Sequence, residues 1–385
     1  MLNFDFYNPT RIVFGQKTIT RLDNLVPANA RILVLFGGSS AERSGTLAEV
    51  RAALKNHNLW EFGGIEPNPT YETLMQAVEL VCTQKLDFLL AVGGGSVIDG
   101  TKFIAAAASF EGDPWRILES FGSAVTGALP FGTVLTLPAT GSEMNFNSVI
   151  TRKSTKTKAF FASPFVYPQF SILDPTKTYS LPPRQLANGV VDAFVHIVEQ
   201  YLTYPVDGRV QDRFAEGLLQ TLIEIGPKVV NEPADYGTRA NLMWTATMAL
   251  NGLIAAGVPQ DWATHLVGHE LTALYGIDHA RTLAIVLPSM LQVRRESKRS
   301  KLLQYAERVW CISEGEENER IGQGIEKTRA FFEGLGVKTR LSDYDISADA
   351  IDGLINQLQV HGMTQLGEHQ DVTLAVSRKV LETSL

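Results

Sequence analysis

The sequence predicts an α/β domain built on a parallel sheet, followed by a domain made of helices alone. Short apolar runs alternate with amphipathic segments from Arg31 to Leu173, a pattern typical of parallel strands that are joined by helices. After the double proline at Pro182 and Pro183, long helical patterns replace the β-branched runs. At 385 residues the chain is also too long for one ordinary core. We therefore predict one domain over residues 1–181 and a second over residues 182–385.

The predicted elements of the first domain follow one another as strand and helix. Strands are expected in the apolar runs at 32–36, 59–62, 88–92, 133–137, 149–151 and 170–173. Helices are expected in the amphipathic segments at 40–54, 71–81 and 97–108. Ligands of such a sheet bind beyond the carboxyl ends of its strands.

The second domain shows apolar residues at helical spacing throughout. Helices are expected at 185–201, 210–225, 236–256, 262–275, 282–296, 301–309, 318–334 and 348–361. No run of strand-like residues interrupts them, so we predict an all-helical domain.

Composition narrows the classes of function. A hydrophobic share of 45% and a charged share of 19% are typical of a globular protein with a sizeable core. The net charge is −7 and no basic run is present, so nucleic acid is not an expected partner. No apolar stretch reaches the length of a membrane span, and the start of the chain does not have the pattern of a signal peptide. Cys82 and Cys311 form no short motif, and we interpret them as reduced structural thiols of a cytoplasmic protein.

The segment from Leu90 to Lys102 combines an apolar strand, three consecutive glycines and the start of a helix. Glycine lets the backbone approach a ligand and adopt positive φ, and the free N–H groups of a helix start attract phosphate. We therefore expect a pyrophosphate at this turn. The spacing is neither that of the Rossmann fingerprint nor that of a P-loop. A plain strand-to-helix turn is the alternative interpretation.

The first predicted strand is followed by four small residues, Gly37, Gly38, Ser39 and Ser40. A ribose is expected here if a dinucleotide lies across the strand ends. An acidic residue would bond the 2′-hydroxyl of NAD and repel a 2′-phosphate, and none is present. Gly38 leaves room, the two serines can bond phosphate oxygens, and Arg43 can add positive charge, although the glutamate before it acts against that. We therefore predict NADP(H) in preference to NAD(H).

A third glycine-containing strand end runs from Leu137 to Asn145. Its hydroxyls and backbone N–H groups can hold phosphate or nicotinamide, and Lys158 can reach a ribose or phosphate. Such residues are common in loops, so this segment is informative only together with the other two strand ends.

Four of the seven histidines lie between residues 191 and 280. Asp192 and His196 stand four apart in an apolar helical segment, so their side chains should project from one face. His265 and His269 repeat this interval on another predicted helix, and His279 follows in an expected loop. One carboxylate and three imidazoles suit Zn²⁺ or Fe²⁺, and a buried carboxylate needs a partner. The residues alone do not show whether His265 or His269 is the metal ligand. A capped or surface Asp/His pair that binds no metal is the alternative interpretation.

Together these segments resemble the iron-containing (group III) alcohol dehydrogenase family, and most closely its bacterial branch of NADPH-dependent aldehyde reductases and butanol dehydrogenases. The resemblance covers essentially the whole chain. It depends on five motifs in this order: Glu66-Pro-Asn68-Pro, Gly93-Gly-Gly-Ser96, Leu137-Pro-Ala-Thr-Gly-Ser-Glu143, Gly189-Val-Val-Asp192-Ala-Phe-Val-His196 and Gly268-His-Glu-Leu-Thr-Ala273. The implied fold is similar to that of dehydroquinate synthase and glycerol dehydrogenase, with a dinucleotide-binding domain at 1–181 and a metal-binding domain at 182–385.

The resemblance also implies roles for single residues. The metal ligands fall on Asp192, His196, His265 and His279, and His269 falls on an unligated catalytic histidine near the nicotinamide. The positions near the cofactor are Asn68, Gly94, Gly95, Ser96, Asp99, Thr136, Thr140, Asn145 and Lys158. NAD-using members commonly have an acidic residue in place of Gly38, which agrees with NADP(H). The ligands do not distinguish iron from zinc.

The activity implied is hydride transfer between NADPH and small aliphatic aldehydes such as butanal, in a homodimer. A metal held by these ligands would polarise the aldehyde oxygen, and a proton would come from solvent, with His269 or a ribose hydroxyl as a relay.

Two alternatives within the superfamily are a polyol dehydrogenase and a metal-dependent lyase. The lyase surrounds an anionic substrate with basic residues, whereas residues 258–280 contain no lysine or arginine. A metal-dependent hydrolase, whose glycine-rich turns are mere connectors, is a third alternative that tight NADPH binding would dismiss.

Overall fold

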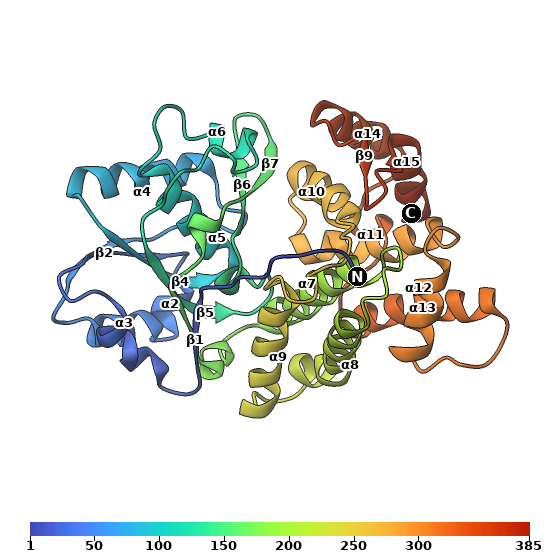
Figure 1. Cartoon of the computed structure of the whole chain (residues 1–385), viewed down its shortest axis with the longest axis horizontal. Coiled ribbons are helices and arrows are strands. Elements are labelled where there is room, and N and C mark those ends of the chain that lie inside the picture. Colours follow the sequence, from blue (N-terminus) through green and yellow to red (C-terminus); the bar gives the residue numbers. More distant parts are fainter. The chain divides into compact units, whose positions relative to one another are not determined.

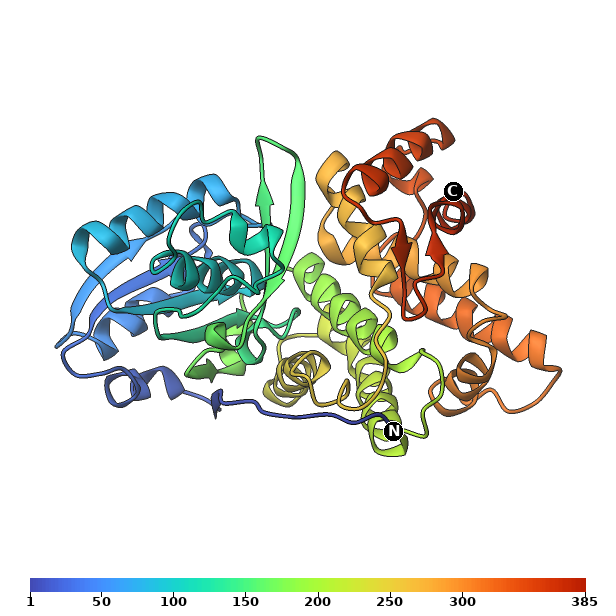
Figure 2. The same ribbon diagram turned by 45° about the horizontal axis from the view of Figure 1, so that its top comes forward.

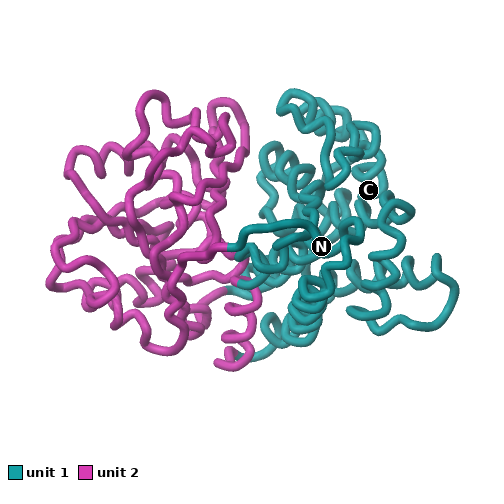
Figure 3. Tube along the Cα trace, viewed as in Figure 1, with its two compact units in different colours: residues 1–6, 182–233, 248–385 teal, residues 7–181, 234–247 magenta.

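The structure is a computed structural model that describes residues 1–385 and contains two compact units (Figure 3). Unit 2 consists of residues 7–181 and 234–247, and unit 1 of residues 1–6, 182–233 and 248–385. A single boundary after Leu181 therefore assigns two short segments, 1–6 and 234–247, to the wrong unit. The binding roles expected of the two parts stay predictions.

Unit 2 is built on a six-stranded sheet in the order β1-β8-β5-β4-β2-β3, in which all neighbouring strands run parallel. Its strands are β1 (Arg11–Phe14), β2 (Arg31–Phe36), β3 (Asn58–Phe62), β4 (Phe88–Gly94), β5 (Phe131–Leu137) and β8 (Phe170–Leu173). The strands β1, β2, β4 and β5 of this sheet are labelled in Figure 1. The prediction missed β1, an edge strand of four residues that is too short to show a period.

The sheet is covered on both faces. Leu33 and Leu35 of β2 pack in one apolar cluster with the helices α4 (Tyr71–Gln84) and α5 (Gly95–Ala107). Ile32 and Val34 pack in a second cluster with α1 (Leu22–Leu25) and α3 (Thr46–Ala53). Strands that are buried on both faces have apolar residues at every position, which explains why β2 and β4 are continuous apolar runs. The helices of this unit are α1 (Leu22–Leu25), α2 (Ser40–Arg43), α3 (Thr46–Ala53), α4 (Tyr71–Gln84), α5 (Gly95–Ala107) and α6 (Arg116–Glu119).

Two predicted elements of unit 2 are corrected. The helix expected at 40–54 is interrupted at Gly45, whose φ of 76° ends α2 and begins α3. The strand expected at 149–151 belongs to β6 (Asn147–Arg152), which pairs antiparallel with β7 (Thr157–Ala162) in a separate hairpin (Figure 2). β7 was not predicted, and only Phe161 of this strand is buried.

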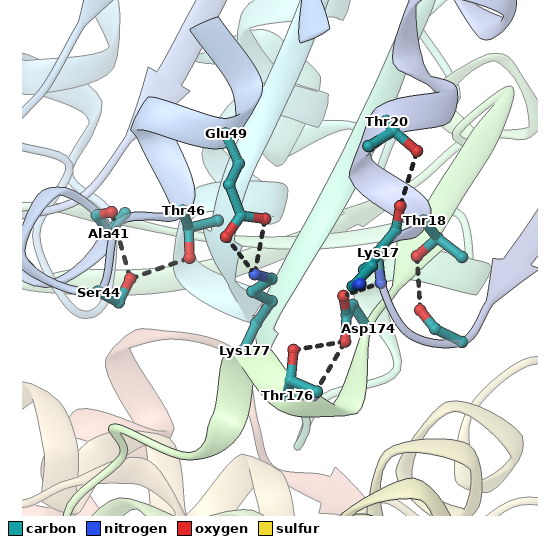
Figure 4. Close-up of polar contacts among 11 residues, drawn as sticks. Lys17, Thr18, Thr20, Ala41, Ser44, Thr46, Glu49, Asp174, Thr176 and Lys177 are labelled. Carbon is teal, nitrogen blue, oxygen red and sulfur yellow. Dashed lines mark hydrogen bonds and ion pairs between the residues drawn. The ribbon is translucent and has the colours of Figure 1, made fainter. Parts of the chain in front are cut away.

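The loop after β8 is fastened to the start of the chain. Asp174 accepts hydrogen bonds from the backbone N–H of Lys17 at 2.8 Å and of Thr176 at 3.0 Å, and Lys177 forms an ion pair with Glu49 of α3 at 2.7 Å (Figure 4). These contacts anchor β1 and β8 at one edge of the sheet.

Residues 234–247, most of helix α9 (Tyr236–Ala249), belong to unit 2 through buried contacts. Met243 joins the cluster on the α4 and α5 face of the sheet. The hydroxyl of Thr247 donates to Glu143 Oε1 at 2.5 Å, and the Trp244 ring lies edge-on to Phe14 with ring centres 6.2 Å apart. The expected helix at 236–256 ends early because a turn at Asn251 and Gly252 follows, with φ of 89° at the glycine.

Unit 1 confirms the helical C-terminal region. Its helices are α7 (Pro183–Tyr201), α8 (Arg209–Asn231), α10 (Ala263–Tyr275), α11 (His279–Val293), α12 (Arg299–Arg308), α13 (Glu317–Gly334), α14 (Ile351–Val360) and α15 (Leu374–Thr383). The prediction of helices alone is wrong in one detail, since β9 (Gln365–Leu366) pairs antiparallel with β10 (Val372–Thr373). α15 was not predicted, although Val380 and Leu381 lie buried in the cluster of α10, α11 and α14.

The predictions about membrane spans and about the two cysteines can also be compared with the structure. None of the helices is long and apolar enough to cross a membrane. Cys82 and Cys311 are free thiols, but both are exposed rather than buried in structural positions.

Candidate metal and nucleotide sites

Helix α7 presents the first two predicted ligands inside unit 1. Asp192 and His196 are one turn apart and only 3% and 5% exposed, so the helical spacing does place both on one buried face. The distance from His196 Nε2 to Asp192 Oδ1 is 3.8 Å. Burial lowers the pKa of His196 to about 4, which keeps the imidazole neutral, the form that binds a metal.

The other histidines come from a helical hairpin. His265 and His269 lie on α10, which ends at Gly276 with φ of 67°. The chain turns there and begins α11 at His279, so this residue is the first of a helix and not part of the loop we expected. The turn brings His279 back against α10, where its ring centre lies 5.2 Å from those of both His265 and His269.

Three of the four predicted ligands form one cluster. Ligand atoms of Asp192, His265 and His279 all lie within 4.8 Å of one another, close to the roughly 3–4 Å that separates atoms each bonded at about 2 Å to one ion. His196 lies beside this cluster, with its ring stacked on His265 at 4.6 Å between ring centres. His269 is buried and lies farther from His265, at 6.4 Å between ring centres.

The donor set suits a divalent ion. One carboxylate with neutral imidazoles is the combination that binds zinc or iron. The Nδ1 atom of His196 is buried with no hydrogen-bond partner, and an orphaned polar atom of this kind calls for an ion or a water molecule. The residues therefore fit the metal that the resemblance implies.

Glu199 is a residue of this site that the sequence prediction missed. Its carboxylate contacts His265 Nδ1 and accepts the backbone N–H of Thr264 at 2.7 Å. A carboxylate on one ring nitrogen directs the other, Nε2, toward the metal. The signal was present in the sequence, because Glu199 follows Asp192 by two turns on the same apolar face of α7.

A buried ion-pair network supports Glu199. The backbone N–H of Asp261 donates to the Glu199 carbonyl at 3.0 Å, and the Asp261 carboxylate lies 2.8 Å from Lys298 Nζ. Lys298 also pairs with Glu368 at 2.6 Å and donates to the carbonyl of Leu202 at 2.7 Å. One buried lysine thus compensates two carboxylates behind the cluster, as burial of charge requires.

In unit 2 the predicted nucleotide site lies where the strand order reverses. The chain passes from β2 outward to β3 and returns to β4 on the other side of β2, and ligands of such sheets bind beyond the strands that flank this switch point. Phe36 and Val92 are partners in register, so the two glycine-rich turns that follow lie side by side. A Cβ at Gly37 would stand 3.6 Å from Val97 of α5.

Close packing, rather than positive φ, explains the three glycines. None of Gly93, Gly94 and Gly95 has positive φ, contrary to part of our expectation. A Cβ on Gly93 would collide with Val97, and one on Gly95 would collide with Thr140. The N-terminus of α5 has no side-chain cap, so a phosphate can accept the first N–H groups of this 13-residue helix.

Several predicted cofactor residues meet at this turn. The Asn68 backbone N–H donates to Ser96 Oγ at 3.3 Å, and Lys158 Nζ donates to Asn68 Oδ1 at 3.0 Å. Asn68 has φ of 55°, a conformation that asparagine tolerates better than most residues. Thr140 packs against Gly95. Residues from four separate segments of the sequence therefore lie together beyond the carboxyl ends of the strands.

The remaining predicted residues also follow, or lie near, the carboxyl ends of the strands. Asp99 Oδ1 accepts the hydroxyl of Ser142 at 2.5 Å, and Asp99 Oδ2 accepts the backbone N–H of Val149 at 2.9 Å. Burial raises the pKa of Asp99. Asn145 is buried beside this pair, and Thr136 is the penultimate residue of β5 and half-buried.

The turn after β2 is open. A Cβ on Gly38 would meet nothing within 4 Å, so packing does not require glycine at this position. Arg43 contacts the Ser39 hydroxyl. Glu42, which we expected to oppose Arg43, forms an ion pair with Arg51 at 2.9 Å, and this reduces its effect on a phosphate bound at the turn.

Comparisons with known proteins identify the family of the chain. Residues 9–175 match the family "Iron-containing alcohol dehydrogenase", and residues 186–374 match "Fe-containing alcohol dehydrogenase family, C-terminal". The NADPH-dependent aldehyde reductase YqhD of Escherichia coli is 60% identical over 100% of both chains. A probable NADH-dependent butanol dehydrogenase of Bacillus subtilis is 41% identical, again over 100% of both.

Solved structures show the same fold. The crystal structure of Escherichia coli YqhD superposes with a TM-score of 0.99 at 59% identity, and covers 100% of this chain and 99% of its own. The NADH-dependent butanol dehydrogenase A of Thermotoga maritima gives a TM-score of 0.96 at 35% identity, with 100% and 99% covered. These similarities confirm the predicted fold class.

The two histidines of α10 can be distinguished by metal content. We expect His265→Ala to lose the bound ion, because His265 is in the cluster, and His269→Ala to retain it. Elemental analysis of the two purified variants, after dialysis at equal metal concentration, measures the difference. Equal loss of metal from both would show that our assignment of the ligands is wrong.

Glu199→Gln tests whether the Glu199 carboxylate fixes the tautomer of His265 that binds the metal. A neutral amide cannot stabilise the His265 tautomer as a carboxylate does, so we expect the dissociation constant of the metal to rise about 10- to 100-fold. Competition with a chelator measures this constant. Glu216→Gln is the matched control, since Glu216 is also a buried carboxylate of unit 1 but accepts from Tyr201 and Arg308. An unchanged constant in Glu199→Gln would contradict the proposed role.

Proposed function

This chain belongs to the iron-containing alcohol dehydrogenase family, and from this membership we propose that it is a metal-dependent, NADP(H)-linked aldehyde reductase for small aliphatic aldehydes such as butanal. The observation that carries the proposal is the cluster of Asp192, His265 and His279 in a chain of this family. A relative with 60% identity is named an NADPH-dependent aldehyde reductase, and others are named butanol dehydrogenases.

The metal site of the proposal consists of Asp192, His196, His265 and His279. An iron or zinc ion held there would act as a Lewis acid on the aldehyde oxygen. We assign the proton transfer to His269. Its ring centre lies 5.2 Å from that of His279, and its imidazole can hold a proton and pass it to the product oxygen. Glu199 orients His265.

The proposed nucleotide site lies beyond the carboxyl ends of the strands in unit 2. NADPH would supply the hydride. Its pyrophosphate is assigned to Gly94, Gly95 and Ser96 at the start of α5. The ribose and nicotinamide are assigned to Asn68, Asp99, Thr136, Thr140, Asn145 and Lys158.

The preference for NADPH over NADH depends on the turn after β2. The open space at Gly38, the hydroxyls of Ser39 and Ser40, and the positive charge of Arg43 favour a 2′-phosphate. The ion pair of Glu42 with Arg51 reduces the opposing effect of the Glu42 charge.

We further propose a homodimer, which comes from the family resemblance alone, and a cytoplasmic location, which agrees with the free thiols of Cys82 and Cys311. Nucleic acid is not proposed as a partner, because the net charge is −7 and the chain has no basic run.

The activity can be tested with protein stripped of metal by a chelator and then refilled with Zn²⁺ or Fe²⁺. We expect oxidation of NADPH with butanal to vanish on stripping, to return with one of the two ions and to exceed oxidation of NADH. Initial rates at 340 nm measure all three effects. If neither nucleotide were oxidised under any metal condition, the aldehyde reductase proposal would be wrong, and the polyol and lyase alternatives would return.

Gly38→Asp tests the choice of nucleotide. An aspartate repels a 2′-phosphate and can bond a 2′-hydroxyl, so we expect KM for NADPH to rise at least about tenfold, whereas KM for NADH changes little or falls. Gly127→Asp is the matched control: a Cβ there also meets nothing within 4 Å, and the charge change is the same. An equal rise for both nucleotides, or a similar effect of the control, would contradict the assignment.

A further inference from the structure

Lys102 is a buried lysine in a helix of small and apolar residues. It lies in the middle of α5 and is 0% exposed. Its Nζ donates three hydrogen bonds: to Ser142 Oγ at 2.8 Å, to Asn145 Oδ1 at 2.8 Å and to the backbone carbonyl of Asn147 at 2.7 Å. An ammonium has three donors, so every one of them is engaged.

All three acceptors lie on one short stretch of chain. Ser142 and Asn145 belong to the loop between β5 and β6, residues 138–146, and Asn147 is the first residue of β6. The same loop contains Thr140, which packs against Gly95 in the turn before α5. Lys102 therefore fastens α5, whose N-terminus is assigned to the pyrophosphate, to the loop assigned to the rest of the nucleotide.

The ammonium also fixes the orientation of the Asn145 side chain. Only the oxygen of an amide can accept from Lys102, and the same Oδ1 accepts the backbone N–H of Asn147 at 3.0 Å. The Nδ2 group is directed the opposite way, with one long contact to the carbonyl of Thr140 at 3.4 Å. Asn145 is thereby presented as a hydrogen-bond donor.

Two carboxylates compensate the buried charge. Asp99 lies one turn before Lys102 on α5 and accepts from Ser142, and Glu143 is buried in the same loop. Burial lowers the pKa of Lys102 to about 8, while Asp99 and Glu143 act to raise it, so the side chain keeps its proton at neutral pH. Desolvating a lysine is costly, and an apolar side chain would fill this position at less cost if packing were its only purpose.

We propose that Lys102 is a positioning residue for the nucleotide: it holds the loop at 138–146 in the conformation in which Thr140 and Asn145 bind the cofactor. This inference rests on the proposed function for its cofactor. The fixed loop lowers the entropy cost of binding, because the side chains are ordered before the nucleotide arrives.

Lys102→Met tests the proposal, since methionine is of similar length and lacks the donors. We expect the dissociation constant of NADPH, measured by fluorescence titration without aldehyde, to rise at least about tenfold. In the nucleotide-free protein we expect faster amide hydrogen exchange at residues 139–147. Metal content should not change, and kcat at saturating NADPH should fall less than kcat/KM.

Lys301→Met is the matched control. Lys301 is also a buried lysine, and it pairs with Asp212 at 2.7 Å within unit 1. We expect this variant to keep the wild-type dissociation constant of NADPH and the wild-type exchange at 139–147. A similar weakening in the control would mean that any lost buried lysine has this effect, and would overturn the specific role of Lys102.

Ser142→Ala tests the positioning role of Lys102 if Lys102→Met does not fold. It removes the hydroxyl that links Lys102 to Asp99, and we expect a rise of about threefold in the dissociation constant with faster exchange in the same loop. Unchanged affinity and exchange in a folded variant would overturn the inference. If the wild type itself did not bind NADPH, the proposed function would fail, and hydrogen exchange alone would then decide whether Lys102 orders the loop.

Discussion

The burial of the Asp192 carboxylate is the constraint on which the helical unit depends. Asp192 lies in an apolar helix and is 3% exposed, and a carboxylate in such surroundings is stable only beside a positive charge or donors. The surrounding elements supply imidazoles that can bind the same ion as this carboxylate. α10 and α11 fold back on each other at Gly276, and this turn places His265 and His279 beside α7. The packing of α7, α10 and α11 and the expected binding of a metal are thus both linked to the need to compensate the buried Asp192 carboxylate.

A second layer of charge stabilises this arrangement. Glu199 contacts the far nitrogen of His265, and Lys298 offsets the nearby carboxylates of Asp261 and Glu368. Burial of Lys298 is thus compensated by two carboxylates, as the high cost of desolvation demands. The α/β unit follows the same principle with different groups, because Lys102 lies among Ser142, Asn145 and the carboxylates of Asp99 and Glu143. In both units a buried ionic group orders the residues that are assigned to a ligand.

Much of the molecule could be predicted from local patterns. The strand and helix periods predicted five of the six strands in the parallel sheet, and the four-residue intervals placed Asp192 and His196 on one face. The errors fall where the period is short or interrupted. β1 and the β9 and β10 pair contain too few residues to show alternation, and one predicted helix breaks at Gly45. His279 was expected in a loop because its short turn masks the helix start.

The sequence by itself determined the fold class, the ligand types and the three glycine-containing strand ends, because each depends on residues near one another in the chain. Only the tertiary structure decided which distant residues meet. It joined Asn68 to Ser96 and Lys158, placed Glu199 on His265, assigned residues 234–247 to the α/β unit and buried Lys102 against the loop after β5. Such contacts follow from chain topology and from the need to pair buried charges, and neither is expressed in the spacing of neighbouring residues.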